Sequence, residues 1–298
     1  MRFSFSIFIL AFIVNFVYSE YVIYSSPQTS SEGSEGIVSS IINGVVTGTN
    51  YYPYIAQLFI TKDQGKSMIF ECTAELIGEQ YILTAAHCVN YDNRTVIPVE
   101  MIKINVGSSY LATSSDIGNF YNVTDVYSAG FDKSTANDIV LLKLDKKVPS
   151  DVATPTKVYP YKITTNLPVE VAGFGSTFYA GPSSKVLLRA LVTVSDSTNC
   201  STFNSDWANN SGPLVCSISP SGNDSCNGDS GGPLVAKLNG KRVLVGTVSW
   251  GRNMNPNSPI NCGTNNVSYY VRTAYFVKWI ASVMNVDYNT LIEIVNSS

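Results

Sequence analysis

Residues Asp224–Leu234 read Asp-Ser-Cys-Asn-Gly-Asp-Ser-Gly-Gly-Pro-Leu, and this stretch carries the clearest chemical signal in the chain. Ser230 stands between Asp229 and the pair Gly231-Gly232. Glycine lets a backbone turn sharply and approach another molecule closely. Such a turn can present a serine hydroxyl together with inward-pointing backbone N–H groups, which are two requirements of acyl transfer. Because Ser-Gly-Gly-Pro is also ordinary loop composition, this interpretation needs support from the rest of the sequence.

The composition is that of a globular chain with sparse charge. The sequence has 298 residues, of which 45% are hydrophobic and 14% are charged, and its formal net charge is -3. This length is enough for a full core in one large β domain or two small ones. The slightly acidic balance offers no basic footprint, so we expect no nucleic-acid partner.

The N-terminus has the pattern of a secretory signal peptide, Met1–Ser19. A positively charged residue precedes the apolar run Phe3–Val17, and a small residue closes it at Ser19. A membrane anchor is the weaker interpretation, because the run is short and Asn15 interrupts it. We therefore predict cleavage after Ser19 and a secreted, extracellular protein without a membrane anchor. In an oxidising compartment the six cysteines suit three disulfides.

The remaining chain divides by composition. Residues 20–40 are rich in Ser, Gly and Glu and lack apolar periodicity, which predicts a solvated propeptide or linker. Strand-like apolar segments begin at Ile41, and the only sustained helical period is in Ala274–Met284. The predicted fold class is therefore all-β with a C-terminal helix. The predicted organisation is signal peptide 1–19, propeptide 20–40, β domain 41–284 with halves at about 41–150 and 160–272, and C-terminal extension 285–298.

Two further stretches contain residues that could work with Ser230. His87, the only histidine, lies in Thr84-Ala85-Ala86-His87-Cys88. A lone histidine is more often a core or surface residue, but an imidazole that titrates near neutrality can take a proton from a serine and return it. Asp138 opens the apolar stretch Ile139–Leu144. It is either a turn residue or a buried carboxylate that holds His87 in the correct tautomer.

His87, Asp138 and Ser230 follow one another in this order, separated by 51 and 92 residues. In this order and spacing the chain resembles the chymotrypsin/trypsin-like serine endopeptidases (peptidase S1) over about Ile41 to Met284. The resemblance implies two antiparallel six-stranded β-barrels with the C-terminal helix packed outside. It also implies that Ser230 is the nucleophile, His87 the general base and then acid, and Asp138 the orienting carboxylate. The backbone N–H groups of Gly228 and Ser230 would form the oxyanion hole.

The resemblance also implies covalent features. The expected disulfides are Cys72–Cys88, Cys200–Cys216 and Cys226–Cys262. In this family a new N-terminal isoleucine ammonium pairs with the acid beside the nucleophile, which here means Ile41 with Asp229. A buried carboxylate without a partner is costly, so the ammonium would order the oxyanion loop and the specificity pocket. Ser40 stands where many relatives have Arg or Lys, so we expect another enzyme or trimming to release Ile41.

Primary specificity is expected to depend on Asp224, which matches the base of the family's primary pocket. A carboxylate there implies cleavage after Arg or Lys, although Asp224 in Asn-Asp-Ser could also be a surface turn acid. Gly251 would leave the pocket mouth open. Ser249, Trp250 and Gly251 would line the pocket and pair with the substrate backbone.

Two departures from the family pattern favour other specificities. Ser268 replaces a pocket-wall glycine, which would narrow the site. The segment Arg252–Asn261 is longer than usual, and Arg252 could reach toward Asp224 and neutralise it. Because an occupied or narrowed pocket favours smaller side chains, chymotrypsin- or elastase-like specificity is the alternative. A catalytically silent binding homologue and a structural secreted glycoprotein are the alternatives from other classes.

No cofactor or metal is expected from the sequence. The loop Gly107–Phe120 contains only Asp116 as an acid for calcium, and one histidine with paired cysteines provides no zinc cluster. The expected partners are protein or peptide substrates and protein protease inhibitors, and we expect a monomer. Sequons occur at Asn93, Asn122, Asn199, Asn209, Asn223, Asn266 and Asn296. Asn223 and Asn266 lie beside the expected pocket, so we expect those two to be unmodified.

Overall fold

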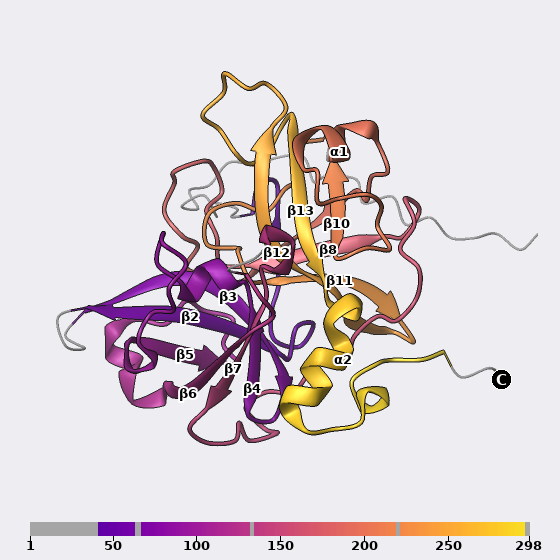
Figure 1. The fold of residues 1–298 in the computed structure, drawn as a ribbon. Coiled ribbons are helices and arrows are strands. Elements are labelled where there is room, and N and C mark those ends of the chain that lie inside the picture. The colour runs from indigo at the N-terminus through magenta and orange to yellow at the C-terminus, as the bar shows by residue number, and fades with distance from the viewer. Residues whose placement is uncertain (1–40, 63–66, 132–133, 219–220, 296–298) are drawn as a thin grey trace, which may run out of the picture. The chain divides into compact units, whose positions relative to one another are not determined.

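The computed structural model describes residues 41–62, 67–131, 134–218 and 221–295. The expected signal peptide and propeptide lie outside these residues. Strands dominate the described part of the chain (Figure 1), and its α-helices are α1 (Thr198–Phe203) and α2 (Thr273–Met284). Across the ranges described, no helix has the length and apolar character needed to cross a membrane.

The first half is a closed antiparallel barrel in which the strands follow the order β2-β3-β4-β7-β6-β5. Their bounds are β2 (Ile55–Lys62), β3 (Ser67–Gly78), β4 (Tyr81–Thr84), β5 (Ile102–Val106), β6 (Tyr121–Ser128) and β7 (Val140–Leu144). Leu58, Leu76, Ile82, Ile104 and Leu142 are fully buried. Branched apolar side chains suit such a closed sheet, because alternate residues of each strand point into the barrel.

The second half is a seven-stranded antiparallel sheet in the order β1-β9-β8-β11-β12-β13-β10. The strands are β1 (Val45–Val46), β8 (Val169–Gly173), β9 (Leu188–Val192), β10 (Leu214–Ile218), β11 (Pro233–Leu238), β12 (Lys241–Asn253) and β13 (Asn266–Arg272). A bridge between Val194 and Ser217 brings the β9 and β10 sides of the sheet together. The all-β class is confirmed, and the seventh strand arises because the short β1 pairs with β9.

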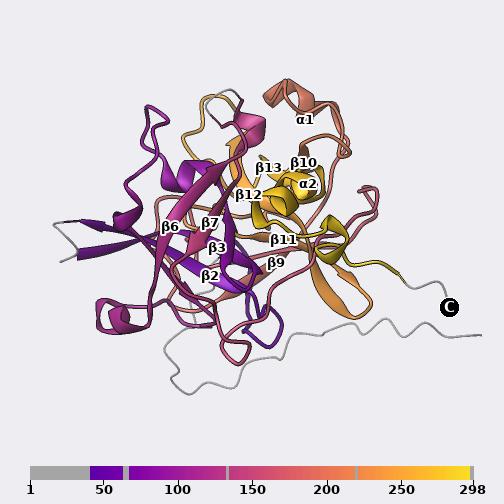
Figure 2. The ribbon, with the colours of Figure 1, turned by 60° about the horizontal axis from the view of Figure 1, so that its bottom comes forward.

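The predicted C-terminal helix is confirmed as α2, which packs beside β12 (Figures 1 and 2). Its apolar face buries Phe276, Val277 and Ile280, as the helical period predicted. The helix ends at Asn285, whose left-handed conformation (φ 54°) is typical of a helix C-cap. The following extension contains a 3-10 turn at Tyr288–Thr290.

A buried acid lies between the two sheets. Glu75 of β3 is fully buried, and its Oε1 accepts a hydrogen bond of 2.8 Å from Thr247 Oγ1 of β12. Its Oε2 has no partner within the described residues. Burial raises the pKa of Glu75 well above its ordinary value, against the opposing effect of the Thr247 hydrogen bond. Burial therefore favours the protonated form of the Glu75 carboxyl group in the folded chain.

We expect Glu75→Gln to stabilise the protein increasingly as the pH rises. The folded pKa lies above the unfolded one, so the stability contributed by the protonated acid is complete at low pH and is lost as the pH rises toward the folded pKa. Glutamine keeps the acceptor for Thr247 and carries no titratable proton. Thermal melts of both proteins at pH 4 and pH 8, in a Ser230→Ala background to prevent self-digestion, measure the difference in thermal midpoint between the variant and the unsubstituted protein. An equal difference at both pH values contradicts the prediction.

Candidate active site

His87 and Asp138 are brought together by the pairing of β4 with β7. His87 lies in a 3-10 turn directly after β4, and Asp138 lies directly before β7. Thr84 at the end of β4 pairs with Val140 at the start of β7, so the two loops leave the barrel at the same edge. The turn that holds His87 is tied to β3 by a disulfide between Cys88 and Cys72.

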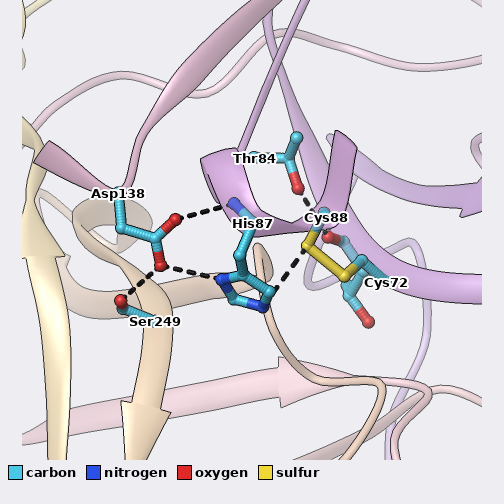
Figure 3. A network of polar contacts seen from close by, with 7 residues as sticks. Cys72, Thr84, His87, Cys88, Asp138 and Ser249 are labelled. Atoms are coloured by element: carbon cyan, nitrogen blue, oxygen red, sulfur yellow. Dashed lines mark hydrogen bonds and ion pairs between the residues drawn. A yellow bond between two sulfur atoms is a disulfide. The ribbon is translucent and has the colours of Figure 1, made fainter. Parts of the chain in front are cut away.

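The carboxylate of Asp138 holds His87 through two bonds (Figure 3). Its Oδ2 lies 2.8 Å from His87 Nδ1, and its Oδ1 accepts from the His87 backbone N–H at 2.9 Å. An ionised carboxylate can only accept hydrogen bonds, so Nδ1 carries the proton and Nε2 is left as the acceptor. This is the tautomer that a general base needs, with Nε2 free to take a proton.

Ser249 of β12 completes the surroundings of this acid. Its Oγ donates to Asp138 Oδ2 at 2.5 Å (Figure 3), a contact that the sequence analysis did not foresee. Burial opposes ionisation of Asp138, but the bonds from His87 and Ser249 outweigh it and lower the pKa of the acid. Partial desolvation lowers the pKa of His87, whose side chain is 38% exposed, but the charge and hydrogen bond of Asp138 raise this pKa above the ordinary histidine value. The pair therefore favours an ionised acid beside the imidazole.

Ser230 lies on a turn that only glycine neighbours permit. Gly228 and Gly231 have φ angles of 94° and 75°, in the region that side chains avoid. A Cβ on Gly231 would overlap Thr84 Oγ1, so the turn packs directly against the end of β4. The Gly231 N–H donates to the Val248 carbonyl at 2.7 Å, which ties the turn to β12.

His87, Asp138, Gly228 and Ser230 line one cavity of about 600 Å³. Within the described residues, the backbone N–H groups of Gly228 and Ser230 donate to no protein acceptor. Two such free donors beside a serine hydroxyl can bind the oxygen of a carbonyl that the hydroxyl attacks. No hydrogen bond between Ser230 and His87 is formed in the described part of the chain, and His87 Nε2 lies 3.8 Å from Cys88 Sγ. Such contacts are often loose without substrate.

Asp229, beside the nucleophile, is fully buried. Its two oxygens accept the backbone N–H groups of Gly175 at 2.8 Å and Cys226 at 2.9 Å. Burial raises the pKa of Asp229 to about 7, because these backbone bonds do not replace a cation. Ile41 is also fully buried, and its φ of 54° is an outlier for a β-branched residue.

Asp224 is buried behind the cavity and is not among the residues that line it. Among the other expected pocket residues, Ser249, Trp250 and Gly251 line the cavity and Ser268 does not. The Trp250 ring packs on Tyr269 with ring centroids 4.5 Å apart. Arg252 lies with its guanidinium over Phe203, 6.0 Å from the ring centroid, and forms no ion pair with Asp224 within the described chain.

Asn266 does not line the cavity, but it is a partner of Asp224 that the sequence analysis did not assign. Its side chain donates to Asp224 Oδ2 at 2.8 Å. The available signal was strand alternation, since Asn266 and Ser268 are two residues apart in β13 and so face the same side. The expectation that Asn266 is not glycosylated fits its burial, because this side chain is 2% exposed.

Metal-ligating side chains gather at one place in the described ranges, at Cys72, His87 and Cys88. The two sulfurs form a disulfide with an S–S distance of 2.08 Å, so they are not available as thiolate ligands. The other disulfides are Cys200–Cys216 and Cys226–Cys262, and all three pairs are those that the resemblance implied.

Comparison with known proteins identifies the family. The family model described as Trypsin matches residues 41–280. Serine protease SP24D of Anopheles gambiae is 30% identical over 245 residues, covering 82% of this chain and 81% of the relative. Trypsin, alkaline A of Manduca sexta is 30% identical over 218 residues, covering 71% of this chain and 80% of the relative. Chymotrypsin-like elastase family member 1 of Homo sapiens is 26% identical over 251 residues, covering 82% of this chain and 92% of the relative. The chain belongs to the chymotrypsin/trypsin-like (S1) family of serine proteases.

Proposed function

We propose that the protein is a secreted serine endopeptidase in which Ser230, His87 and Asp138 form the catalytic triad. The observation that carries this proposal is the cavity that Ser230 shares with an imidazole whose Nδ1 is bound to Asp138 and with the unpaired backbone N–H groups of Gly228 and Ser230 itself. A silent binding homologue would have no need for this combination. Protein or peptide substrates, protein protease inhibitors and a monomeric state belong to the same proposal.

The proposed reaction proceeds in two steps. Ser230 Oγ attacks the scissile carbonyl carbon while its proton moves to His87 Nε2, and the carbonyl oxygen becomes an oxyanion bound by the N–H groups of Gly228 and Ser230. His87 then gives this proton to the leaving amine as the C–N bond breaks, which leaves an acyl ester on Ser230. Water attacks the ester by the same proton route, so the acid is released and Ser230 regains its hydrogen.

Labelling with a sulfonyl fluoride tests this proposal. The processed wild-type chain should lose its activity as one sulfonyl group is attached to Ser230, which mass spectrometry of the digested protein locates. The control is Ser230→Ala, which keeps the turn and removes the nucleophile. If the processed wild-type chain is not labelled, the silent-homologue alternative is supported and the enzyme proposal fails.

We also propose that cleavage between Ser40 and Ile41 activates the enzyme. Asp229 is a buried acid without a cation in the described chain, and a new Ile41 ammonium would supply one. The φ angle of Ile41 is defined by the carbonyl carbon of the preceding residue, so cleavage of the peptide bond before Ile41 removes this unfavourable backbone conformation.

We predict that Ser40→Arg makes the precursor activatable by added trypsin, whereas the double variant Ser40→Arg with Asp229→Asn is cut at the same bond and stays inactive. N-terminal sequencing verifies the cut; activity of the Asp229→Asn form contradicts the pairing.

The pH dependence should report the His87–Asp138 pair. We predict that kcat/KM falls on the acid side with a midpoint above the ordinary histidine value, because Asp138 raises the pKa of His87 against the opposing effect of partial desolvation. Asp138→Asn should shift this midpoint to lower pH and reduce kcat by about 10⁴-fold, since the tautomer is no longer fixed. Steady-state measurements of kcat and kcat/KM against pH for both proteins test this prediction. An unchanged acid midpoint in the variant would show that Asp138 does not control the imidazole.

Asp224 suggests specificity for Arg or Lys, and the alternative is specificity for smaller side chains. The hydrogen bonds that surround Asp224 favour the second. Secretion after cleavage at Ser19 and glycosylation at exposed sequons such as Asn93 also belong to the proposed function, and mass spectrometry of the secreted chain tests both.

A further inference from the structure

The carboxylate of Asp224 is already occupied by four neutral donors. Its Oδ1 accepts the backbone N–H of Ser225 at 2.9 Å and the hydroxyl of Ser268 at 2.7 Å. Its Oδ2 accepts the backbone N–H of Gly263 at 3.0 Å and the side-chain amide of Asn266 at 2.8 Å. Each oxygen thus has one backbone donor and one side-chain donor. No cation contacts this acid among the described residues.

The orientation of the Asn266 amide is determined by its neighbours. Its Nδ2 faces Asp224 Oδ2, and Nδ2 also lies 3.0 Å from Ser268 Oγ. The opposite orientation would place an amide oxygen against a carboxylate oxygen, where two acceptors repel. The remaining Oδ1 of Asn266 has no donor within the described chain although it is buried. The unpaired group on this side chain is therefore an acceptor that carries no formal charge.

Asn266 and Ser268 also fill the space in front of Gly251, which lines the cavity. A Cβ added to Gly251 would lie 2.6 Å from Asn266 Nδ2, which is closer than side chains tolerate, and in a tight contact of 3.1 Å with Ser268 Oγ. Gly251 pairs with Ser268 across β12 and β13, so the cavity-lining glycine and a donor to Asp224 belong to one strand ladder. The cavity surface nearby is formed by Ser225 and Cys262, with Asp224 behind it.

We propose that Asn266 and Ser268 cover Asp224 and thereby make the primary pocket select small, uncharged side chains (Ala, Ser, Thr or Val) before the scissile bond. This inference rests on the proposed function. A long cationic side chain would have to displace two side-chain donors from a buried carboxylate, and hydrogen bonds to charged groups are the strong ones. A short side chain displaces neither. Asn266 and Ser268 are therefore specificity-determining residues of the proposed reaction.

The raised pKa of Asp224 agrees with a covered acid. Burial raises this pKa to about 6, and the four hydrogen bonds only partly oppose the rise. An acid that regularly meets a substrate cation needs an open approach for the guanidinium or ammonium, whereas Asp224 is 2% exposed. The cover differs from the one suggested by the sequence, because Arg252 lies over Phe203 and takes no part in it.

The first test compares substrates on the processed wild-type enzyme. A panel of fluorogenic peptides that differ only in the residue before the scissile bond would carry Ala, Ser, Thr, Val, Phe, Lys or Arg. We expect kcat/KM for the four small residues to exceed that for Arg and Lys by at least about tenfold, in the range that pocket contacts supply. A preference of the wild-type enzyme for Arg or Lys overturns the inference.

The second test opens the pocket. Asn266→Ala combined with Ser268→Gly removes both covering donors, and we expect kcat/KM for Arg and Lys to rise by at least about tenfold. Adding Asp224→Ser to this double variant should abolish the gain, because the gain requires the carboxylate. Benzamidine, an aromatic amidinium, serves as a probe that needs no turnover: calorimetry should detect millimolar or tighter binding to the double variant only. Binding of benzamidine to the wild-type enzyme with equal affinity contradicts the cover.

Sulfonyl fluoride labelling separates this inference from the proposed function. Every protein in the two tests should be labelled at Ser230, which also shows that the variants are folded around the active site. If the wild-type enzyme is labelled and prefers Arg, the cover fails while the endopeptidase stands. If the wild-type enzyme is not labelled, the proposed function itself fails.

Discussion

His87→Ala is expected to lower kcat by about 10⁶-fold, the loss seen when one member of a Ser-His-Asp unit is removed. Nε2 of this imidazole is the proton acceptor for Ser230, because Nδ1 is bound to Asp138 at 2.8 Å. The sequence has one histidine, so no second imidazole can replace it. Alanine leaves the disulfide between Cys72 and Cys88 in place, so the loop should keep its position.

Non-additivity provides the control for this variant. His87→Ala combined with Ser230→Ala should be no slower than either single variant, because the residues act as one unit. A residual rate of about 10³–10⁴-fold over uncatalysed hydrolysis should remain, supplied by the oxyanion donors and substrate binding. Pre-steady-state and long-incubation assays cover this range. If His87→Ala keeps more than about one hundredth of wild-type kcat, another base serves Ser230 and the triad assignment is wrong.

Glu170→Ala is expected to destabilise the fold by about 3–5 kcal/mol, because it leaves the mostly buried Arg242 cation without its carboxylate and removes the partner of the partly exposed Arg189. Glu170 of β8 is 6% exposed and lies 3.0 Å from Arg189 Nη1 and 3.2 Å from Arg242 Nη2. It also accepts the Tyr52 hydroxyl at 2.9 Å. Tyr52 precedes β2 of the barrel, and the other three belong to the second sheet, so this network joins the two halves.

The loss should appear as a fall in the thermal midpoint of roughly 6–20 °C, given the size of the described chain. Melts would again use the Ser230→Ala background. The matched control is Glu79→Ala, which breaks a solvent-exposed pair between Glu79 and Lys147 at 2.8 Å and should leave the midpoint unchanged. Equal effects of the two substitutions would show that the Glu170 network contributes no more than a surface pair.

Local signals in the sequence were sufficient for the class of the fold but not for every element. The strand-like apolar segments that begin at Ile41 predicted an all-β body, and the helical period of Ala274–Met284 predicted α2. The short helix α1 was not predicted, because its six residues are mostly polar and show no helical period. The seventh strand of the second sheet was also missed, because β1 has two residues.

The sequence by itself determined the chemistry: a serine on a glycine turn, one histidine, and an acid that opens an apolar strand are local patterns. The tertiary structure decided which groups these residues meet. Ser249 bonds to Asp138 and Asn266 covers Asp224 because strand pairing and loop packing bring distant segments into contact. Identical residue types bond different partners when the register changes by one residue, because side chains then switch faces. A motif therefore names the reactive groups, whereas their partners, and with them the shape of the pocket, follow from the packed strands.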